Sequence, residues 1–309
     1  MPSPLPHAHA HAHPDGRAGI DAALVERLIA AQFPQWRGLP VVPVEVDGWD
    51  NRTYRLGDAM TVRLPTAAGY VPAVEKEHVW LPRLAPSLPV PVPPVLALGA
   101  PGEGYPFPWS VRRWLPGETA ARGHIEDLPG FAASVAGFLR ALQRCDPAGG
   151  PAAGAHSWHR GASPAYYDEQ TRRCLTLLAD RVDTDRARPA WEAALAAEWH
   201  GDPVWFHGDI AAGNLLVRGG ELSAVIDFGT SGVGDPACDL VIAWTTFDGE
   251  SREAFRESAA QDPGTWARAR GWALWKALLN LVLDTEADPA RAANELRVVE
   301  AVVGEHEAR

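Results

Sequence analysis

The chain has 309 residues, 46% of them hydrophobic and 22% charged, which is typical of a globular protein whose core needs no covalent or metal support. Its formal net charge of −11 argues against a nucleic-acid-binding surface and a basic membrane anchor, and weakly favours cationic ligands. Three cysteines without Cys-x-x-Cys spacing, no apolar run of membrane-spanning length and no secretory leader predict a cytoplasmic protein without a disulfide framework.

The N-terminal third begins with a tail and continues with short strands. Residues 1–18 combine prolines with histidines that alternate with alanine, which predicts a disordered tail and leaves metal binding by the histidines as an alternative. Apolar periodicity then predicts a helix over 21–33, followed by strands at Val41–Val46, Thr53–Leu56 and Met60–Leu64. Further along we expect a helix over 71–81 ended by Pro82, an extended proline-rich connector over 86–94 and a strand over 109–114.

After Pro116 the pattern becomes mainly helical. Helices are predicted at about 127–145, 164–182, 188–199, 236–247, 264–284 and from 289 onward, with two short strands near 215–226. A small β-rich front and a larger helical back predict an α+β protein with two lobes. We therefore divide the chain into a tail of residues 1–18, an N-terminal lobe of residues 19–115 with a small antiparallel sheet, and a mostly helical C-terminal lobe of residues 116–309.

Two motifs flank a predicted hairpin. Residues 207–214 read His-Gly-Asp-Ile-Ala-Ala-Gly-Asn, and residues 226–229 read Ile-Asp-Phe-Gly. Between them, a Gly219-Gly220 loop separates two apolar runs, which predicts a tight β-hairpin. In that register Asn214 lies opposite Val225, and Asp227 is on the same face, about 7–8 Å away along the diagonal. Their oxygens could share one or two Mg²⁺ ions, because Mg²⁺–oxygen bonds are about 2.0–2.1 Å long.

The two motifs resemble those of kinases, in which His-Arg-Asp-x-x-x-x-Asn and Asp-Phe-Gly carry the base and the magnesium ligands. Gly208 replaces the arginine, and no Ala-Pro-Glu segment follows Gly229. The pattern is similar to that of the aminoglycoside phosphotransferase family. The similarity runs from about Val44 to Asp239 and continues more weakly to about Lys276. This resemblance implies a bilobal protein-kinase-like fold, a nucleotide-binding N-terminal lobe, ATP or GTP with Mg²⁺, and a small-molecule hydroxyl acceptor. Together with the acidic net charge, the sequence predicts no nucleic-acid or membrane partner, and no obligate protein partner is evident.

The kinase pattern also assigns roles within the catalytic loop. Asp209 is the expected base, which acts chiefly by orienting the acceptor hydroxyl for in-line attack. Asn214 and Asp227 are the expected magnesium ligands. By resemblance, Asp239 supports the catalytic loop, and for His207 a scaffolding role is favoured over a catalytic one.

A kinase-like site also needs a cation for the nucleotide phosphates and a glutamate that holds it. Arg63, on the predicted strand 60–64, is the candidate cation in place of the usual lysine. At 100° per residue, Glu77 lies within the apolar stripe of the helix over 71–81, whereas Glu75 faces the other way. Because a carboxylate directed into a core needs a partner, we expect Glu77 to pair with Arg63.

Two further segments are candidates for nucleotide contacts. The loop Asp47–Asn51 joins the first two strands, and by resemblance the backbone near Gly48 and Asn51 contacts phosphate, although a plain hairpin turn is the alternative. By the same resemblance, the backbone of the strand that contains Ser110, Val111 and Arg112 holds the purine. The side chain of Arg112 is otherwise expected to be a solvated flank.

The acceptor is the least defined part of the prediction. An acidic run would suit a polycationic acceptor, although a solvated surface is the favoured alternative; it contains Asp248, Glu250, Glu253, Glu257 and Asp262. The leading hypothesis is an aminoglycoside-like antibiotic kinase that confers resistance. A macrolide kinase, a metabolic kinase for choline, homoserine or an amino sugar, and a non-catalytic nucleotide-binding pseudokinase are the alternatives.

Overall fold

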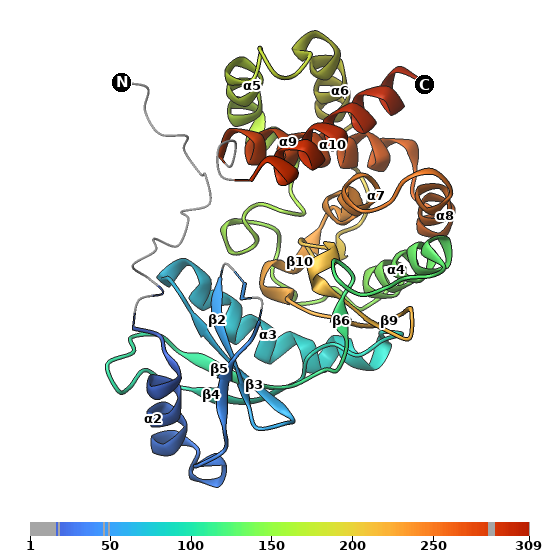
Figure 1. Cartoon of the computed structure of the whole chain (residues 1–309). Helices are drawn as coiled ribbons and strands as arrows, with labels where there is room; N and C mark the ends of the chain where they lie inside the picture. The colour runs from blue at the N-terminus through green and yellow to red at the C-terminus, as the bar shows by residue number, and fades with distance from the viewer. Residues whose placement is uncertain (1–16, 18, 46, 49, 284–287, 309) are drawn as a thin grey trace. The chain divides into compact units, whose positions relative to one another are not determined.

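The computed structural model describes residues 17, 19–45, 47–48, 50–283 and 288–308, which form two compact units (Figure 1). The N-terminal unit contains the described residues up to Gly117 together with Ala224–Gly229, and the C-terminal unit contains Glu118–Ser223 and the described residues from Thr230 onward. A small antiparallel sheet dominates the first unit and helices dominate the second, so the predicted α+β class is confirmed. The predicted tail falls almost entirely outside the described residues.

The N-terminal unit is built on a five-stranded antiparallel sheet with the order β1-β2-β3-β5-β4. Its strands are β1 (Val41–Pro43), β2 (Asn51–Leu56), β3 (Met60–Pro65), β4 (Val95–Gly99) and β5 (Trp109–Arg113). β1 is shorter than predicted. β4 escaped prediction because it directly follows the proline-rich connector.

Alternation along the strands separates a core face from a polar face. Helix α2 (Ala22–Gln32), capped by the Asp21 side chain, contributes Leu28 and other apolar residues to a cluster that includes Val62 of β3 and Val111 of β5. Because successive strand residues point to opposite faces, Arg63 projects from the other face. The sheet therefore presents a buried polar row opposite its hydrophobic core.

Helix α3 (Val71–Leu84) packs against β4 and β5 (Figure 1). The prediction that Pro82 ends this helix was wrong, because α3 continues through it to Leu84. Pro82 lies in the last turn, so its missing N–H removes a single hydrogen bond close to the end of the helix.

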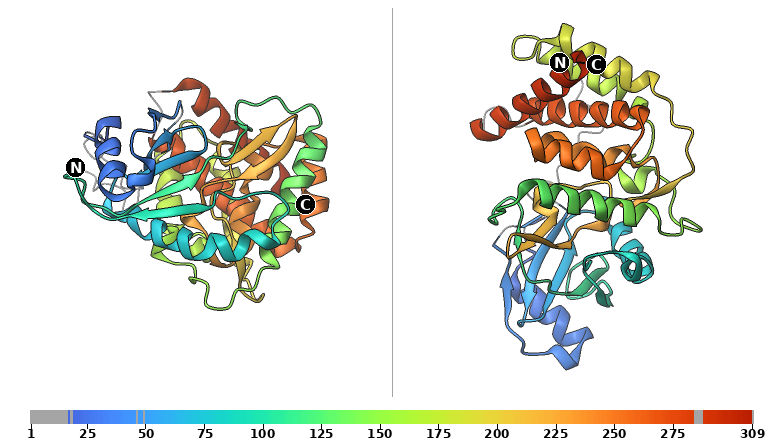
Figure 2. Two further views of the ribbon diagram at one scale, coloured as in Figure 1. Left: turned by 90° about the horizontal axis from the view of Figure 1, so that it is seen from below. Right: turned by 90° about the vertical axis from the view of Figure 1, so that its right-hand side faces the viewer.

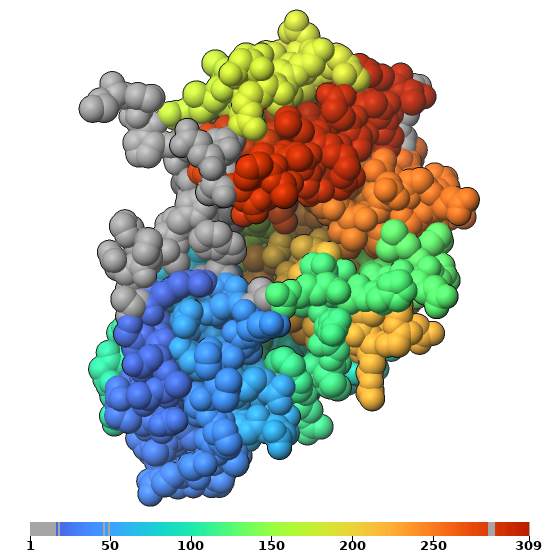
Figure 3. Space-filling model, in the orientation of Figure 1, coloured from blue at the N-terminus to red at the C-terminus, as the bar shows by residue number. Residues whose placement is uncertain are grey.

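The C-terminal unit consists mainly of helices around α9 (Pro263–Leu283). The other helices are α4 (Leu128–Gln143), α5 (Asp168–Leu177), α6 (Thr184–Ala196), α7 (Ile242–Thr245), α8 (Gly249–Ala259) and α10 (Pro289–Glu307). α9 packs against α5, α6 and α10, and Figure 2 shows α10 running beside it. On the face shown in Figure 3, α6 (yellow-green) and α10 (red) meet. α9 is therefore buried along most of its length.

Short strands flank the loops that contain the two sequence motifs. β6 (Glu118–Thr119), β8 (Leu215–Arg218) and β9 (Glu221–Val225) form one sheet, and β7 (Val204–Phe206) pairs with β10 (Gly232–Gly234). The predicted β8–β9 hairpin is confirmed: Gly219 and Gly220 have φ angles of +61° and +84°, the left-handed values that a two-residue turn requires. The Ser223 hydroxyl donates to the Leu216 carbonyl at 3.1 Å, as expected for the predicted register.

Cys145, Cys174 and Cys238, all within the described residues, are buried and form no disulfide bond. Among the described residues, no helix is both long and apolar enough to cross a membrane.

Candidate active site

The catalytic loop begins with a turn that strongly favours glycine. Gly208 has φ +85°, and a Cβ added there would lie 2.8 Å from the carbonyl oxygen of Thr230. The Thr230 hydroxyl donates to the carbonyl of His207 at 3.0 Å. The absence of a side chain at 208 therefore lets the loop approach the Thr230 backbone.

The carboxylate of Asp239 fixes this turn by accepting hydrogen bonds from its backbone. This carboxylate, 1% exposed, accepts the backbone N–H groups of His207 and Gly208, both at 2.7 Å. Burial nevertheless raises the pKa of Asp239, although these hydrogen bonds and His207 act against the increase. His207 is fully buried and accepts the N–H of Asp209 through Nδ1 at 3.2 Å. Both residues thus hold the loop rather than reach solvent.

The carboxylate of Asp209 is engaged at both oxygens. Nδ2 of Asn214 donates to Oδ2 at 3.1 Å and to the Asp209 carbonyl at 2.9 Å, while Nζ of Lys276 contacts Oδ1 at 3.1 Å. The side chains of Asp209 and Lys276 are 35% and 33% exposed. The Asp209 carboxylate therefore has lone pairs that can accept a further hydrogen bond, and it is accessible to solvent. Sequence reasoning did not identify Lys276 as a site residue.

Charge keeps the Asp209 carboxyl ionised. Burial would raise its pKa, but the Lys276 ammonium and the Arg160 guanidinium outweigh burial and hold the pKa well below its ordinary value. An ionised carboxylate can accept a hydrogen bond from an alcohol and orient it.

In the N-terminal unit, Glu77 pairs chiefly with Arg112. As predicted, Glu77 is buried, at 3% exposed, but its two oxygens accept hydrogen bonds from the Arg112 guanidinium at 2.8 and 2.5 Å. The expected partner, Arg63, lies farther away, at 3.7 Å. Burial would raise the pKa of Glu77, but the two arginines lower it to about 2. The expectation that Arg112 is a solvated flank was wrong, since only 2% of it is exposed.

Arg63 links this pair to the Asp-Phe-Gly turn. Its guanidinium donates to Oδ1 of Asp227 at 2.8 Å, and Glu77 accepts the backbone N–H of Phe228 at 3.1 Å. Asp227 has φ +68°, which is strained for a residue other than glycine. These two contacts hold the Asp-Phe-Gly turn against Arg63 and Glu77.

The other predicted nucleotide contacts have the following positions. Asn51 begins β2, and Gly48 lies in the loop before it, where Trp49 falls outside the described residues. Ser110 and Val111 lie on β5 and are fully buried, with the Ser110 hydroxyl accepting Nε of Arg112 at 3.0 Å. β5 lies between β3 and β4, so the backbone of these residues belongs to the ladders of the sheet on both sides.

The donor set fits magnesium bound through a nucleotide. Among the described residues, no group of three or more His, Cys, Asp or Glu side chains could hold a metal ion. Mg²⁺ keeps several waters and binds through one or two protein oxygens together with phosphates, so a closed protein cage is not required. The carboxylate of Asp227 and the amide oxygen of Asn214 are hard oxygen donors of the right kind.

Two members of the acidic run begin helices of the C-terminal unit. Asp248 and Asp262 cap α8 and α9, respectively, and Asp262 accepts the N–H groups of Gly264 and Thr265. Asp262 precedes Lys276 by 14 residues, which is about 21 Å along α9 at 1.5 Å per residue. The charges beside Asp209 are instead the cations Lys276 and Arg160.

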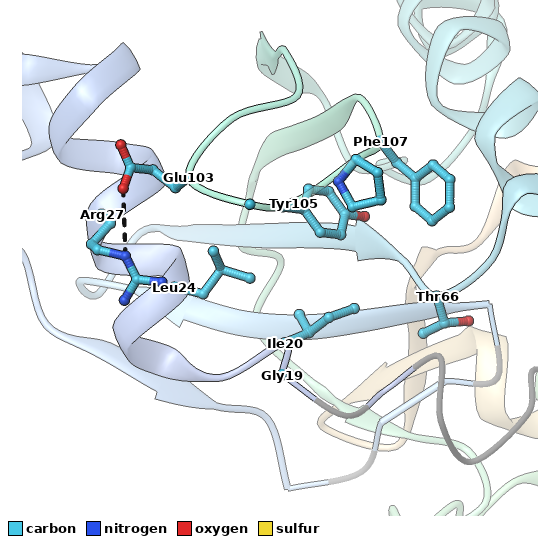
Figure 4. Close-up of a pocket in the computed structure, with 10 residues that line it drawn as sticks. Gly19, Ile20, Leu24, Arg27, Thr66, Glu103, Tyr105 and Phe107 are labelled. Atoms are coloured by element: carbon cyan, nitrogen blue, oxygen red, sulfur yellow. Dashed lines mark ion pairs between the residues drawn. The ribbon is translucent and has the colours of Figure 1, made fainter.

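A cavity of about 390 Å³ opens within the N-terminal unit (Figure 4). It lies between α2 and the loop before β5, with Ile20, Leu24 and Tyr105 in its wall and an ion pair of Arg27 and Glu103 at its side. None of the predicted site residues lines it.

The fold and the loop around Asp209 define a phosphotransferase of the protein-kinase-like class. The profile of the APH phosphotransferase enzyme family matches residues 41–272, and the chain belongs to this family. It is a phosphotransferase with an alcohol group as acceptor. No curated protein sequence matches the chain.

Solved structures share the fold at low sequence identity. The GDP complex of aminoglycoside 2'-phosphotransferase-IIIa is 17% identical, with a TM-score of 0.67 over 93% of this chain and 99% of that one. A thermostable mutant of aminoglycoside phosphotransferase APH(4)-Ia is 20% identical, with a TM-score of 0.65 over 92% and 100%. Macrolide 2'-phosphotransferase MphH from Brachybacterium faecium is 23% identical, with a TM-score of 0.57 over 91% and 97%.

Proposed function

We propose that the protein transfers the γ-phosphoryl group of ATP or GTP to a hydroxyl group of an aminoglycoside-like antibiotic. The observation that carries this proposal is the Asp209 carboxylate, which Asn214 and Lys276 contact on a loop anchored by Asp239 and which stays about one-third exposed. Solved relatives in complex with GDP, ADP, kanamycin or gentamicin support the nucleotide and the acceptor.

Each residue of the site has a proposed part. Asp209 accepts a hydrogen bond from the acceptor hydroxyl, orients its oxygen toward the γ-phosphorus and takes its proton. Arg63, kept in place by Glu77, binds the nucleotide phosphates. Asn214 and Asp227 would hold Mg²⁺, which supplies charge neutralisation on the phosphates. Backbone groups near Gly48 and Asn51 bind the phosphates. The backbone of Ser110, Val111 and Arg112 pairs with β3 and β4, so we do not assign it to the purine.

A macrolide is the second candidate acceptor. The cations Lys276 and Arg160 beside Asp209 do not attract a polycation, and Asp262, at the start of α9, lies about 21 Å along that helix from Lys276. A neutral or weakly basic acceptor with a large apolar face is compatible with this charge.

Nucleotide consumption with Mg²⁺ and either ATP or GTP tests the proposal. The acceptors are kanamycin, gentamicin, a macrolide, choline, homoserine and an amino sugar, with Asp209→Asn as the control. Aminoglycoside-dependent turnover that the variant abolishes supports the proposal, and turnover with a macrolide alone supports the second candidate. Nucleotide binding without turnover of any acceptor would indicate a pseudokinase.

A further inference from the structure

Helix α9 places a lysine at the catalytic carboxylate. The indole of Trp275, 3% exposed, stacks on the Tyr167 ring with centroids 4.1 Å apart and donates to Gln170 at 2.6 Å. These contacts fix the rotation of α9 about its axis. The next residue, Lys276, thereby extends its ammonium to 3.1 Å from Oδ1 of Asp209.

The identity of this cation is unusual for the chain. Of the 28 lysine and arginine residues in the chain, only two, Lys76 and Lys276, are lysines. A guanidinium would bind both oxygens of Asp209 in a fork, whereas an ammonium contacts one oxygen as a point charge and leaves lone pairs for a hydroxyl. The position therefore suits lysine chemically.

Lys276 also lies within reach of the reacting groups. A hydroxyl bound to the Asp209 carboxylate would lie within about 6 Å of Nζ, since each hydrogen bond spans about 3 Å. The ammonium has two further N–H donors, and the side chain is one-third exposed. Arg160, in contrast, is 7% exposed and lies over the Trp275 ring. Of these two cations, Lys276 is the one that can touch an incoming substrate.

We propose that Lys276 is a catalytic residue that contacts the phosphoryl group during its transfer, an inference that depends on the proposed function. In that step the acceptor oxygen forms a bond to the γ-phosphorus, and the bond from phosphorus to the β,γ-bridging oxygen breaks. The electron pair leaves with the nucleoside diphosphate, and the hydroxyl proton passes to Asp209. Lys276 donates to an equatorial phosphoryl oxygen and offsets the charge there.

The test compares Lys276→Met, Lys276→Arg and Arg188→Met, the last of which removes an exposed positive charge from α6. Basal hydrolysis of ATP and GTP with Mg²⁺ is measured, because water replaces the acceptor and no acceptor needs to be known. Lys276→Met should lower kcat about 100-fold or more with a nearly unchanged nucleotide KM, as for loss of one transition-state donor. Arg188→Met should match the wild type.

Lys276→Arg separates catalysis from a structural ion pair. We expect it to retain less than about a tenth of wild-type kcat, because the fork occupies both carboxylate oxygens. Thermal midpoints of both variants should stay within about 3 °C of wild type, since a partly exposed pair contributes little stability. Wild-type kcat in Lys276→Arg, or a loss below fivefold in Lys276→Met, would overturn the proposal. Asp209→Asn tests the proposed function separately, because its failure to lower hydrolysis would refute that function whatever Lys276 does.

Discussion

Replacing Arg112 by methionine should destabilise the N-terminal unit through Glu77. The pKa of Glu77 is about 2, against an ordinary value of 4.5, and this difference of about 2.5 corresponds to ~3 kcal/mol in favour of the folded, ionised state. Losing one partner of a buried pair typically costs ~3–5 kcal/mol. Because Arg63 remains at 3.7 Å, we expect the lower end, about 3 kcal/mol at pH 7.

The pH dependence of the wild type follows from the same pair. The folded-state pKa of Glu77 is lowered, so the unfolded chain binds the proton more readily, and the stabilisation is complete above about pH 4.5. It is lost as the pH falls from there toward about 2. Without Arg112, burial dominates and raises the pKa of Glu77, so the acid loss should begin at a higher pH.

Urea unfolding followed by circular dichroism at pH 7 and at descending pH measures both effects. Arg113→Met is the matched control, because Arg113 is the exposed neighbour on the same strand. The double variant Glu77→Met, Arg112→Met should recover most of the loss, since no charge then remains buried alone. The reasoning fails if Arg112→Met is no less stable than Arg113→Met, or if the double variant is as unstable as Arg112→Met.

Three further outcomes concern the catalytic loop. Asp209→Ala should lower turnover by about 10²–10⁴ with nucleotide binding nearly intact in equilibrium titration; normal turnover would remove Asp209 from the mechanism. Gly208→Ala should cost about 1–3 kcal/mol in urea unfolding, because of its φ of +85° and the 2.8 Å approach to Thr230, whereas Gly213→Ala, with open space around it, should cost less than 1 kcal/mol. Asp239→Asn should lose about 1–3 kcal/mol, because one oxygen cannot accept both loop N–H groups; an unchanged urea midpoint would contradict this.

Local signals predicted those parts of the molecule that depend on near neighbours in the chain. The Gly219-Gly220 sequence was enough to predict the β8–β9 hairpin, since both residues adopt the left-handed backbone angles that the turn requires. Helical periodicity was enough for the burial of Glu77. In both cases the physical cause lies within a few residues, so the pattern alone could show it.

Partners distant in sequence escaped prediction. Arg112 lies 35 residues from Glu77, and Lys276 lies 67 residues from Asp209, so no local period connects either pair. The available signals were weak: the place of Arg112 on a strand with buried neighbours, and the rarity of lysine in the chain.

Helix α8 was missed for a related reason. Its charged sequence indicated only an acidic surface, whereas a capping box of Asp248 and Ser251 and the burial of Phe255 hold it as a helix. These tertiary contacts override a composition with little apolar periodicity.

The N-terminal unit is discontinuous in the chain, and this affects its synthesis. Its sheet ends before Gly117, but the turn that satisfies Arg63 and Glu77 arrives only with Ala224–Gly229. At a ribosomal rate of about 5–20 residues per second, the 112 residues between Gly117 and Gly229 take roughly 6–22 s to emerge. A unit that folded within that interval would lack the Phe228 N–H that Glu77 accepts in the full chain. A fragment cut once after Gly117 would lack that turn, so an excised N-terminal unit would need the 224–229 segment supplied in trans or grafted through a linker.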